Sequence, residues 1–141
     1  MAITNNVSFA FPPNTKIFVN ALSNSGAVQH VAILPPTGSA ATFEGKGEGN
    51  VQMNLATKGF LNAPAPGGQP FFMTPATGGD YKITVTTTLP NKSKVIGGKT
   101  LAQNPSGGEF CTAWVNSEDS ADGDYDDSLV LFTYFSPASP I

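Results

Sequence analysis

The chain has 141 residues, enough for a single domain with one hydrophobic core, and we treat residues 1–141 as one domain. It contains 15 Gly, 12 Pro and 10 Phe but only 12% charged residues, a composition that excludes a mainly helical soluble protein. The formal net charge is −3, and all seven basic residues are Lys. Because nucleic-acid readers rely on Arg for bidentate contacts, we expect no nucleic-acid partner.

The N-terminal segment and the single cysteine bear on compartment and cross-linking. Residues 1–6 carry neither a basic n-region nor an apolar h-region, so we expect no signal peptide. No apolar run approaches the ~18 residues that span a bilayer, so we expect no membrane insertion. We expect synthesis in the cytoplasm, with leaderless release as the route to an extracellular or cell-surface role. Cys111 is the only cysteine, which excludes an intrachain disulfide, and its apolar surroundings predict a buried thiol.

Eight short segments with period-two alternation or β-branched and aromatic enrichment predict strands. Clusters of Pro, Gly, Asn and Ser separate them, including one at residues 23–26. Short strands at this spacing predict an all-β protein built as an antiparallel β-sandwich. The predicted strands are residues 7–11, 16–22, 28–34, 40–43, 51–55, 81–88, 109–116 and 128–135.

Residues 56–80 break this rhythm with four Pro and five Gly, and they predict a long insertion loop. Phe71 and Phe72 lie inside it. Anchoring of the loop to the body of the domain is the preferred interpretation of these two rings. A subunit contact or a ligand-site wall remains open.

Six of the ten acidic residues fall within residues 118–127, between two predicted strands. Two carboxylates ~4 Å apart repel by roughly 4 kcal/mol at an effective dielectric near 20. Strands on both sides deny this loop the extension that relieves an acidic tail, so a bound cation is the simplest remedy. Oxygen ligands without convergent His or Cys favour Ca²⁺. The spacing of Asp122, Asp124 and Asp126 also opens an EF-hand, but the required Gly and Glu positions hold Asp127 and Thr133, which excludes that motif.

The acidic segment, S-E-D-S-A-D-G-D-Y-D-D-S-L-V-L-F, resembles the signature loop of the calcium-dependent fucose- and mannose-binding bacterial lectins, the Pseudomonas aeruginosa lectin II family. That family's pattern is S-E-D-G-x-D-x-D-Y-N-D followed by an apolar strand. Residues 7–15 are similar to its V-F-x-L-P-A-N-T opening, and residues 21–29 are similar to its Asn and three-residue specificity loop. The resemblance covers both ends of the chain well and the middle poorly.

The resemblance implies a β-sandwich of about nine strands that binds two adjacent Ca²⁺ ions per subunit, and a lectin, not an enzyme. Vicinal hydroxyls of a fucose- or mannose-type sugar on a glycan would complete both coordination spheres. One ion would be held by Glu118, Asp122, Asp124 and Asp127, and the other by Asn24, Asp124, Asp126 and Asp127. The sugar-binding set would be Asn24, Ser25, Gly26, Glu118, Asp119, Asp122, Asp124 and Asp127. Ser25 in the specificity loop implies a preference for fucose over mannose. The family resemblance also implies a homodimer or homotetramer.

Two departures from the family pattern bear on the site. Asp126 stands where the family has Asn, and the chain continues four residues past the family's C-terminus, whose carboxylate reaches a partner's calcium site. We hypothesise that Asp126 replaces this carboxylate, so that each subunit builds its site alone.

Two other classes of function compete with the lectin interpretation. Paired carboxylates can hydrolyse glycosides, but six crowded acids suit a cation better than an isolated acid and base. One His and one Cys suggest no catalytic triad. The remaining alternative is a calcium-stabilised structural or adhesive β-sandwich without a sugar site. Trp114 invites a sugar-stacking role, but its place in mid-strand favours core packing.

Overall fold

The structure is a computed structural model that describes residues 5–63, 68–87, 94–103, 109–118 and 127–136. The described residues form β-strands and no helix, and every pair of neighbouring strands is antiparallel. Among the described residues there is no helix with the length and hydropathy that crossing a membrane requires. The expected all-β antiparallel fold of about nine strands is confirmed. The strands are β1 (Asn6–Ala10), β2 (Lys16–Leu34), β3 (Ala41–Gln52), β4 (Asn54–Thr57), β5 (Phe71–Met73), β6 (Asp80–Thr87), β7 (Lys94–Gln103), β8 (Glu109–Glu118) and β9 (Ser128–Ser136).

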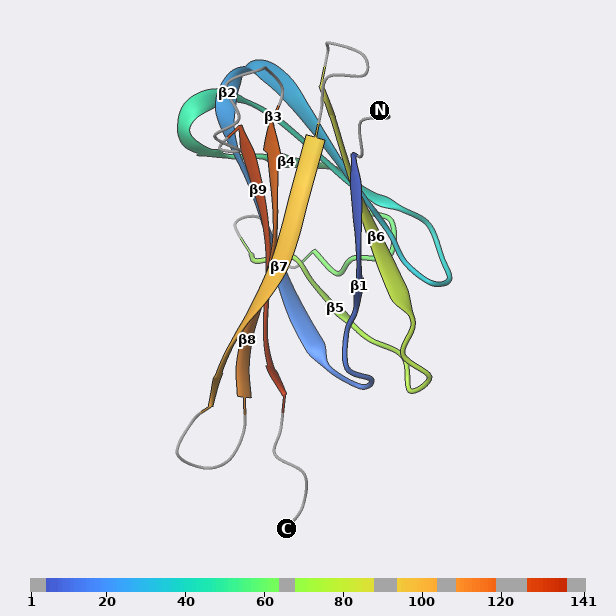
Figure 1. Ribbon diagram of the computed structural model, residues 1–141. Helices are drawn as coiled ribbons and strands as arrows, with labels where there is room; N and C mark the ends of the chain where they lie inside the picture. Colours follow the sequence, from blue (N-terminus) through green and yellow to red (C-terminus); the bar gives the residue numbers. More distant parts are fainter. Residues whose placement is uncertain (1–4, 64–67, 88–93, 104–108, 119–126, 137–141) are drawn as a thin grey trace.

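The 19-residue strand β2 connects the two halves of the sandwich (Figure 1). Its first part pairs with β9 and β5, and its last part pairs with β6 and β3. Val19 lies opposite Phe132 of β9, whereas Ile33 lies opposite Ile83 of β6. The two halves therefore form one continuous hydrogen-bonded sheet with the order β1-β6-β2-β9-β8-β7.

The two ends of this sheet, β1 and β7, lie against each other, so that the sheet is nearly closed. A Cβ atom on Gly97 would lie 2.8 Å from Cγ1 of Val7 and 3.3 Å from the ring of Phe9. Because a side chain at this position would collide with β1, glycine permits the close approach of the two strands.

An aromatic cluster fills the centre of the core. The ring of Phe11 lies 5.2 Å from that of Phe132, 5.5 Å from Tyr81 and 5.9 Å from Phe72, centroid to centroid. Phe72 is 1% exposed and comes from β5, inside the segment expected to be a loop. The ring of Phe72 anchors the segment to the body of the domain, which agrees with the interpretation preferred from the sequence. Cys111 is buried, as expected.

Three sequence expectations differ from the structure. Residues 23–26 were expected to form a turn, but they continue β2, with register shifts between Ser23 and Ser25 and between Ser25 and Gln29. These irregularities absorb the polar, glycine-containing stretch without ending the strand. Strand β7 was not expected at all, because Gly97 and Gly98 interrupt the β-branched pattern. Trp114 is half-buried on the outer face of β8, where its ring covers Gly98, and it does not belong to the core.

Candidate functional site

The acidic segment connects β8 to β9, and its two ends are held together by the hairpin. Ser117 lies opposite Ser128 in the last pair of the ladder, and their buried hydroxyl groups are hydrogen-bonded to each other. The amide of Asp127 donates a hydrogen bond to the carbonyl oxygen of Ser117 (3.1 Å). Glu118 and Asp127 therefore stand side by side at the base of the segment.

Strand β2 brings Asn24 to the same place. Ser23 pairs with Ser128, and the amide of Asn24 donates a hydrogen bond to the carbonyl oxygen of Asp127 (2.8 Å). Residues that lie near opposite ends of the sequence thus meet at the base of the acidic hairpin. The association of Asn24 with the acidic segment, which the sequence suggested only through family resemblance, is a contact in the fold.

Ser25 and Gly26 follow Asn24 at the irregular part of β2. The hydroxyl of Ser25 accepts a hydrogen bond from the amide of Ala27 (3.1 Å), and the Ser25 side chain is largely buried. Gly26 is exposed, and a Cβ atom there would meet nothing within 4 Å. The backbone at Gly26 therefore faces open space, where a ligand can approach.

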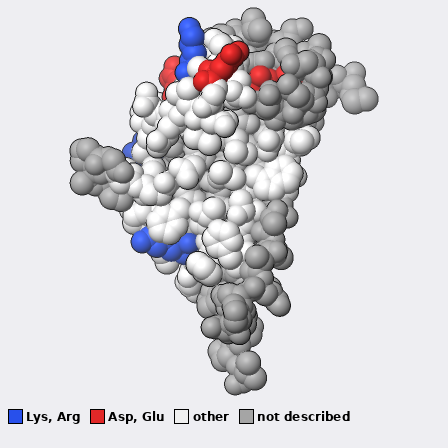
Figure 2. Space-filling view, turned by 90° about the vertical axis from the view of Figure 1, so that its left-hand side faces the viewer, with Lys and Arg blue, Asp and Glu red and all other residues white. Residues whose placement is uncertain are grey.

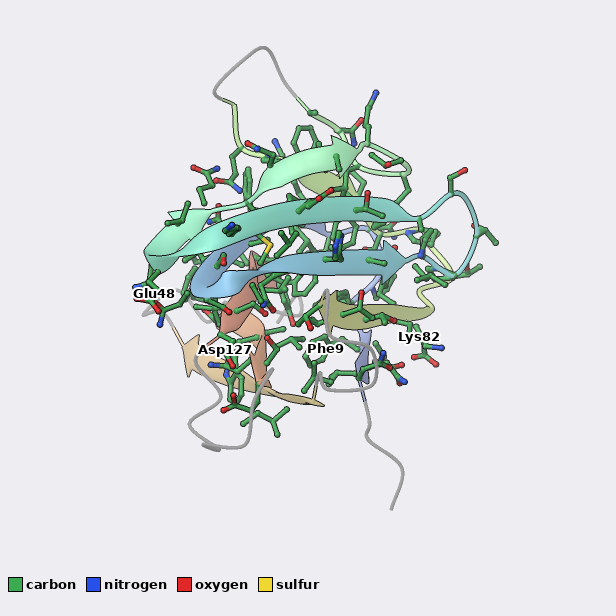
Figure 3. The ribbon with its side chains drawn as sticks, turned by 90° about the horizontal axis from the view of Figure 1, so that it is seen from above. Phe9, Glu48, Lys82 and Asp127 are labelled. Carbon is green, nitrogen blue, oxygen red and sulfur yellow. The ribbon has the colours of Figure 1, made fainter. Side chains whose placement is uncertain are left out.

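Residues 47–50 of β3, which include none of the predicted site residues, form the other side of this region. The carbonyl oxygen of the Asn24 side chain accepts a hydrogen bond from the amide of Gly49 (2.7 Å). The hydroxyl of Ser23 donates to the carbonyl oxygen of Gly47 (3.2 Å). Figure 3 shows Glu48, between these two glycines, on the same side of the molecule as Asp127. The alternating glycines could have indicated that residues 47–50 belong to the site. Gly47 and Gly49 adopt φ of 129° and 90°.

The electrostatics of the described part centre on Glu118. Its side chain is 1% exposed, whereas Asp127 is half-buried. A carboxylate buried as completely as that of Glu118 is stable only when hydrogen bonds or a positive charge compensate for its lost hydration. The side-chain oxygens of Glu118, Asp127 and Asn24 are hard ligands of the kind that Ca²⁺ prefers. The donor set at the base of the hairpin therefore favours calcium over zinc or copper.

Three predicted calcium ligands and one predicted sugar-binding residue belong to the central part of the acidic segment. Asp119, Asp122, Asp124 and Asp126 lie outside the described residues. Within the described part of the chain, no group of three or more His, Cys, Asp or Glu side chains is placed to hold a metal ion. Of the predicted site, the structure brings together Asn24, Ser25, Gly26, Glu118 and Asp127, from two distant stretches of sequence.

Solved structures of bacterial lectins share this fold. A lectin of Chromobacterium violaceum, CV2L, in complex with α-methyl-fucoside superposes with a TM-score of 0.64 at 24% identity, covering 95% of this chain and 96% of that one. A high-affinity mannose-binding lectin of Ralstonia solanacearum superposes with a TM-score of 0.65 at 24% identity and the same coverage. The C-terminal domain of the BC2L-C lectin of Burkholderia cenocepacia gives 0.60 at 23% identity, covering 98% and 97%.

Sequence comparison identifies the family. Direct comparison with curated protein sequences gives no significant match. The family model of fucose-binding lectin II (PA-IIL) matches residues 9–136, which include β2, the acidic segment and both of its flanking strands. The chain therefore belongs to the fucose-binding lectin II (PA-IIL) family, a family of lectins and not of enzymes, as the sequence analysis expected.

Proposed function

We propose that this protein binds a fucose- or mannose-type monosaccharide at the end of a glycan, through two adjacent Ca²⁺ ions held at the acidic hairpin. The observation that carries this proposal is the contact between Asn24 and Asp127, with 2.8 Å between amide nitrogen and carbonyl oxygen. It joins the two sequence segments that the family resemblance assigns to the site. Family membership supports carbohydrate binding, and the oxygen-only donor set supports calcium.

Each residue of the site has a distinct role in this proposal. Glu118, Asp122, Asp124 and Asp127 hold one ion, and Asn24, Asp124, Asp126 and Asp127 hold the other. Bound calcium supplies positive charge and free coordination positions that hydroxyl oxygens of a neutral sugar can fill. The carboxylate of Asp119 accepts sugar hydroxyl protons, and the exposed backbone at Gly26 leaves room for the sugar ring. Ser25 favours fucose over mannose.

We also propose that each subunit completes its own calcium site. Asp126 adds a carboxylate where the family pattern has Asn, and this charge replaces the C-terminal carboxylate of a partner subunit. The count of carboxylates then stays at five: Glu118, Asp122, Asp124, Asp126 and Asp127.

Self-association into a homodimer or homotetramer is supported by the outer face of β2, β8 and β9. Phe18, Phe110 and Phe135 on this face are 38%, 40% and 62% exposed and border a groove of about 390 Å³. Figure 2 shows the side of the molecule where β8 and β9 lie in Figure 1, with a broad surface that carries few charged side chains. Monomeric proteins rarely expose contiguous apolar surface of this kind, and a mainly apolar face, with Lys16 at the groove, can pair with its own copy.

The test of the function is a calorimetric titration of the full chain with α-methyl-fucoside and with α-methyl-mannoside, in millimolar calcium and after chelation. We expect saturable binding of at least one sugar in calcium and none after chelation. Calcium binding without binding of either sugar would instead support a calcium-stabilised structural or adhesive domain. Sugar binding that survives chelation would contradict the metal-dependent mechanism.

A further inference from the structure

A cavity of about 400 Å³ lies beside β2, where one edge of the strand has no neighbouring strand among the described residues. On this edge, β5 pairs with residues 16–18 and β3 resumes at Leu22. Between these two pairings, the amide of Val19 donates a hydrogen bond to the carbonyl oxygen of Pro70 (3.0 Å). The amide of Met53 donates a hydrogen bond to the carbonyl oxygen of Ala21 (2.8 Å). Open space lies here between β2, residues 52–55 and the segment that contains Pro70.

The lining of this cavity combines neutral amides with apolar groups. Asn20, Gln52 and Asn54 supply side-chain amides, and Gln52 and Asn54 are exposed. Met53, Leu55 and Pro70 supply apolar surface. None of the described residues that line the cavity is charged. A charged ligand would find no opposite charge there, whereas a sugar offers hydroxyl groups to the amides and C–H groups to the apolar surface.

The amide side of the cavity also lies in line with the calcium-site residue Asn24. Asn20, Leu22 and Asn24 alternate onto the same face of β2. Gln52 lies directly opposite Leu22, so its side chain projects from that same face. Strand geometry places Cα of Asn20 about 13 Å and Cα of Leu22 about 7 Å from Cα of Asn24. A short oligosaccharide can span this distance.

We infer that this cavity is a second carbohydrate subsite, which receives the inner residues of an oligosaccharide whose terminal sugar is held at the acidic hairpin. This inference rests on the proposed function. Gln52 and Asn54 hydrogen-bond the inner sugar residues, and the partly exposed apolar surface of Leu55 and Pro70 packs against their rings. Asn20 is already an acceptor for the Gln69 side chain (3.0 Å), which fixes its amide at the cavity wall. The protein thus prefers oligosaccharides over the terminal monosaccharide alone.

The experiment compares monosaccharide and trisaccharide affinities of the calcium-loaded protein and of a Gln52→Ala/Asn54→Ala double variant. The ligands are α-methyl-fucoside with 2′-fucosyllactose, and α-methyl-mannoside with a linear mannotriose. Asn6→Ala, an amide removed from β1 at a distant sheet position, is the matched control. We expect the double variant to lose about fivefold or more in trisaccharide affinity, with monosaccharide affinity unchanged within about twofold. The control keeps both affinities, and side-chain amide spectra of the wild type show Gln52 and Asn54 shifting with trisaccharide only.

Each other outcome has one meaning. Equal trisaccharide affinities of the wild type and the double variant, with both ligands binding, overturn the subsite and leave the proposed function intact. A parallel loss of both affinities also overturns it, since it would show that the two amides act on the primary site. Absence of monosaccharide and trisaccharide binding in the wild type overturns the proposed function and the subsite together.

Discussion

The backbone amide of Asn24 and the backbone carbonyl of Asp127 are hydrogen-bonded at 2.8 Å, although they belong to opposite ends of the chain. This bond does not involve either side chain, so the backbone alone fixes the spacing of the two residues. Substitutions of either side chain therefore leave this backbone contact in place.

Asn24→Ala tests the second calcium position. We expect calcium affinity to fall by about tenfold or more, because an oxygen ligand is lost while the backbone bond to Asp127 remains. Asn24→Asp keeps an oxygen both for the metal and for the amide of Gly49, and it should retain most of the affinity. Calcium titration followed by calorimetry measures both variants. Wild-type calcium affinity in Asn24→Ala would remove this residue from the metal site.

Two separate variants, Asp126→Asn and a deletion of residues 138–141, test whether the calcium site is complete within one subunit. If Asp126 replaces a partner's terminal carboxylate, the substitution should lower calcium affinity by about tenfold, and the truncation should leave it unchanged. Titration of both variants with calcium decides the matter. Loss of affinity on truncation alone would show that the C-terminal residues, not Asp126, complete the site.

Phe72→Ala tests the anchoring of the segment that contains β5. Phe72 is 1% exposed and packs against Phe11, Phe60 and Tyr81, so the truncation should cost about 3–5 kcal/mol of unfolding free energy. The neighbouring Phe71 is only half-buried, and Phe71→Ala should cost about 1 kcal/mol. Urea unfolding monitored by circular dichroism gives both values. Equal costs for the two rings would contradict the assignment of Phe72 as the anchor.

Replacement of Phe110 and Phe135 by Ser tests self-association through the outer face of β8 and β9. The two rings lie 5.4 Å apart, centroid to centroid, and adding two hydroxyl groups to this exposed surface should shift the protein to monomer. Leu34→Ser, at an exposed apolar position at the end of β2, is the control and should keep the wild-type mass. Sedimentation velocity measures all three. A monomeric wild type, or a double variant with the mass of the wild type, would exclude this interface.

Tyr81 predicts a loss of stability at alkaline pH. Burial raises the pKa of the Tyr81 phenol above its ordinary value of 10.0, so the folded state keeps the proton to a higher pH than the unfolded state does. The contribution of the protonated Tyr81 phenol to the free energy of unfolding is complete below pH 10. It is lost as the pH rises through the folded-state pKa. Urea unfolding at pH 9 and pH 11 should therefore show a larger loss for the wild type than for Tyr81→Phe. An equal loss in both proteins would mean that other groups account for the pH dependence.

The sequence by itself determined the fold class, and it predicts the chemistry of the acidic hairpin. Alternation of buried and exposed residues follows the period of a strand, and it placed β1, β6, β8 and β9 within about two residues of their observed ends. Six acids between two such strands predict a bound cation. Residues whose signals are local were therefore predictable.

Only the tertiary structure decided which distant segments meet. Gly97 and Gly98 belong to a strand because β1 and Trp114 occupy the space that side chains would need, and no local pattern encodes that crowding. Asn24 contacts Gly49 because β2 continues through a polar stretch that resembles a turn in sequence. The amide-lined cavity lies where, among the described residues, no strand pairs with one edge of β2 over three residues, a property of sheet pairing. Pairing depends on burial summed over the whole domain, so composition and periodicity within one segment cannot specify it.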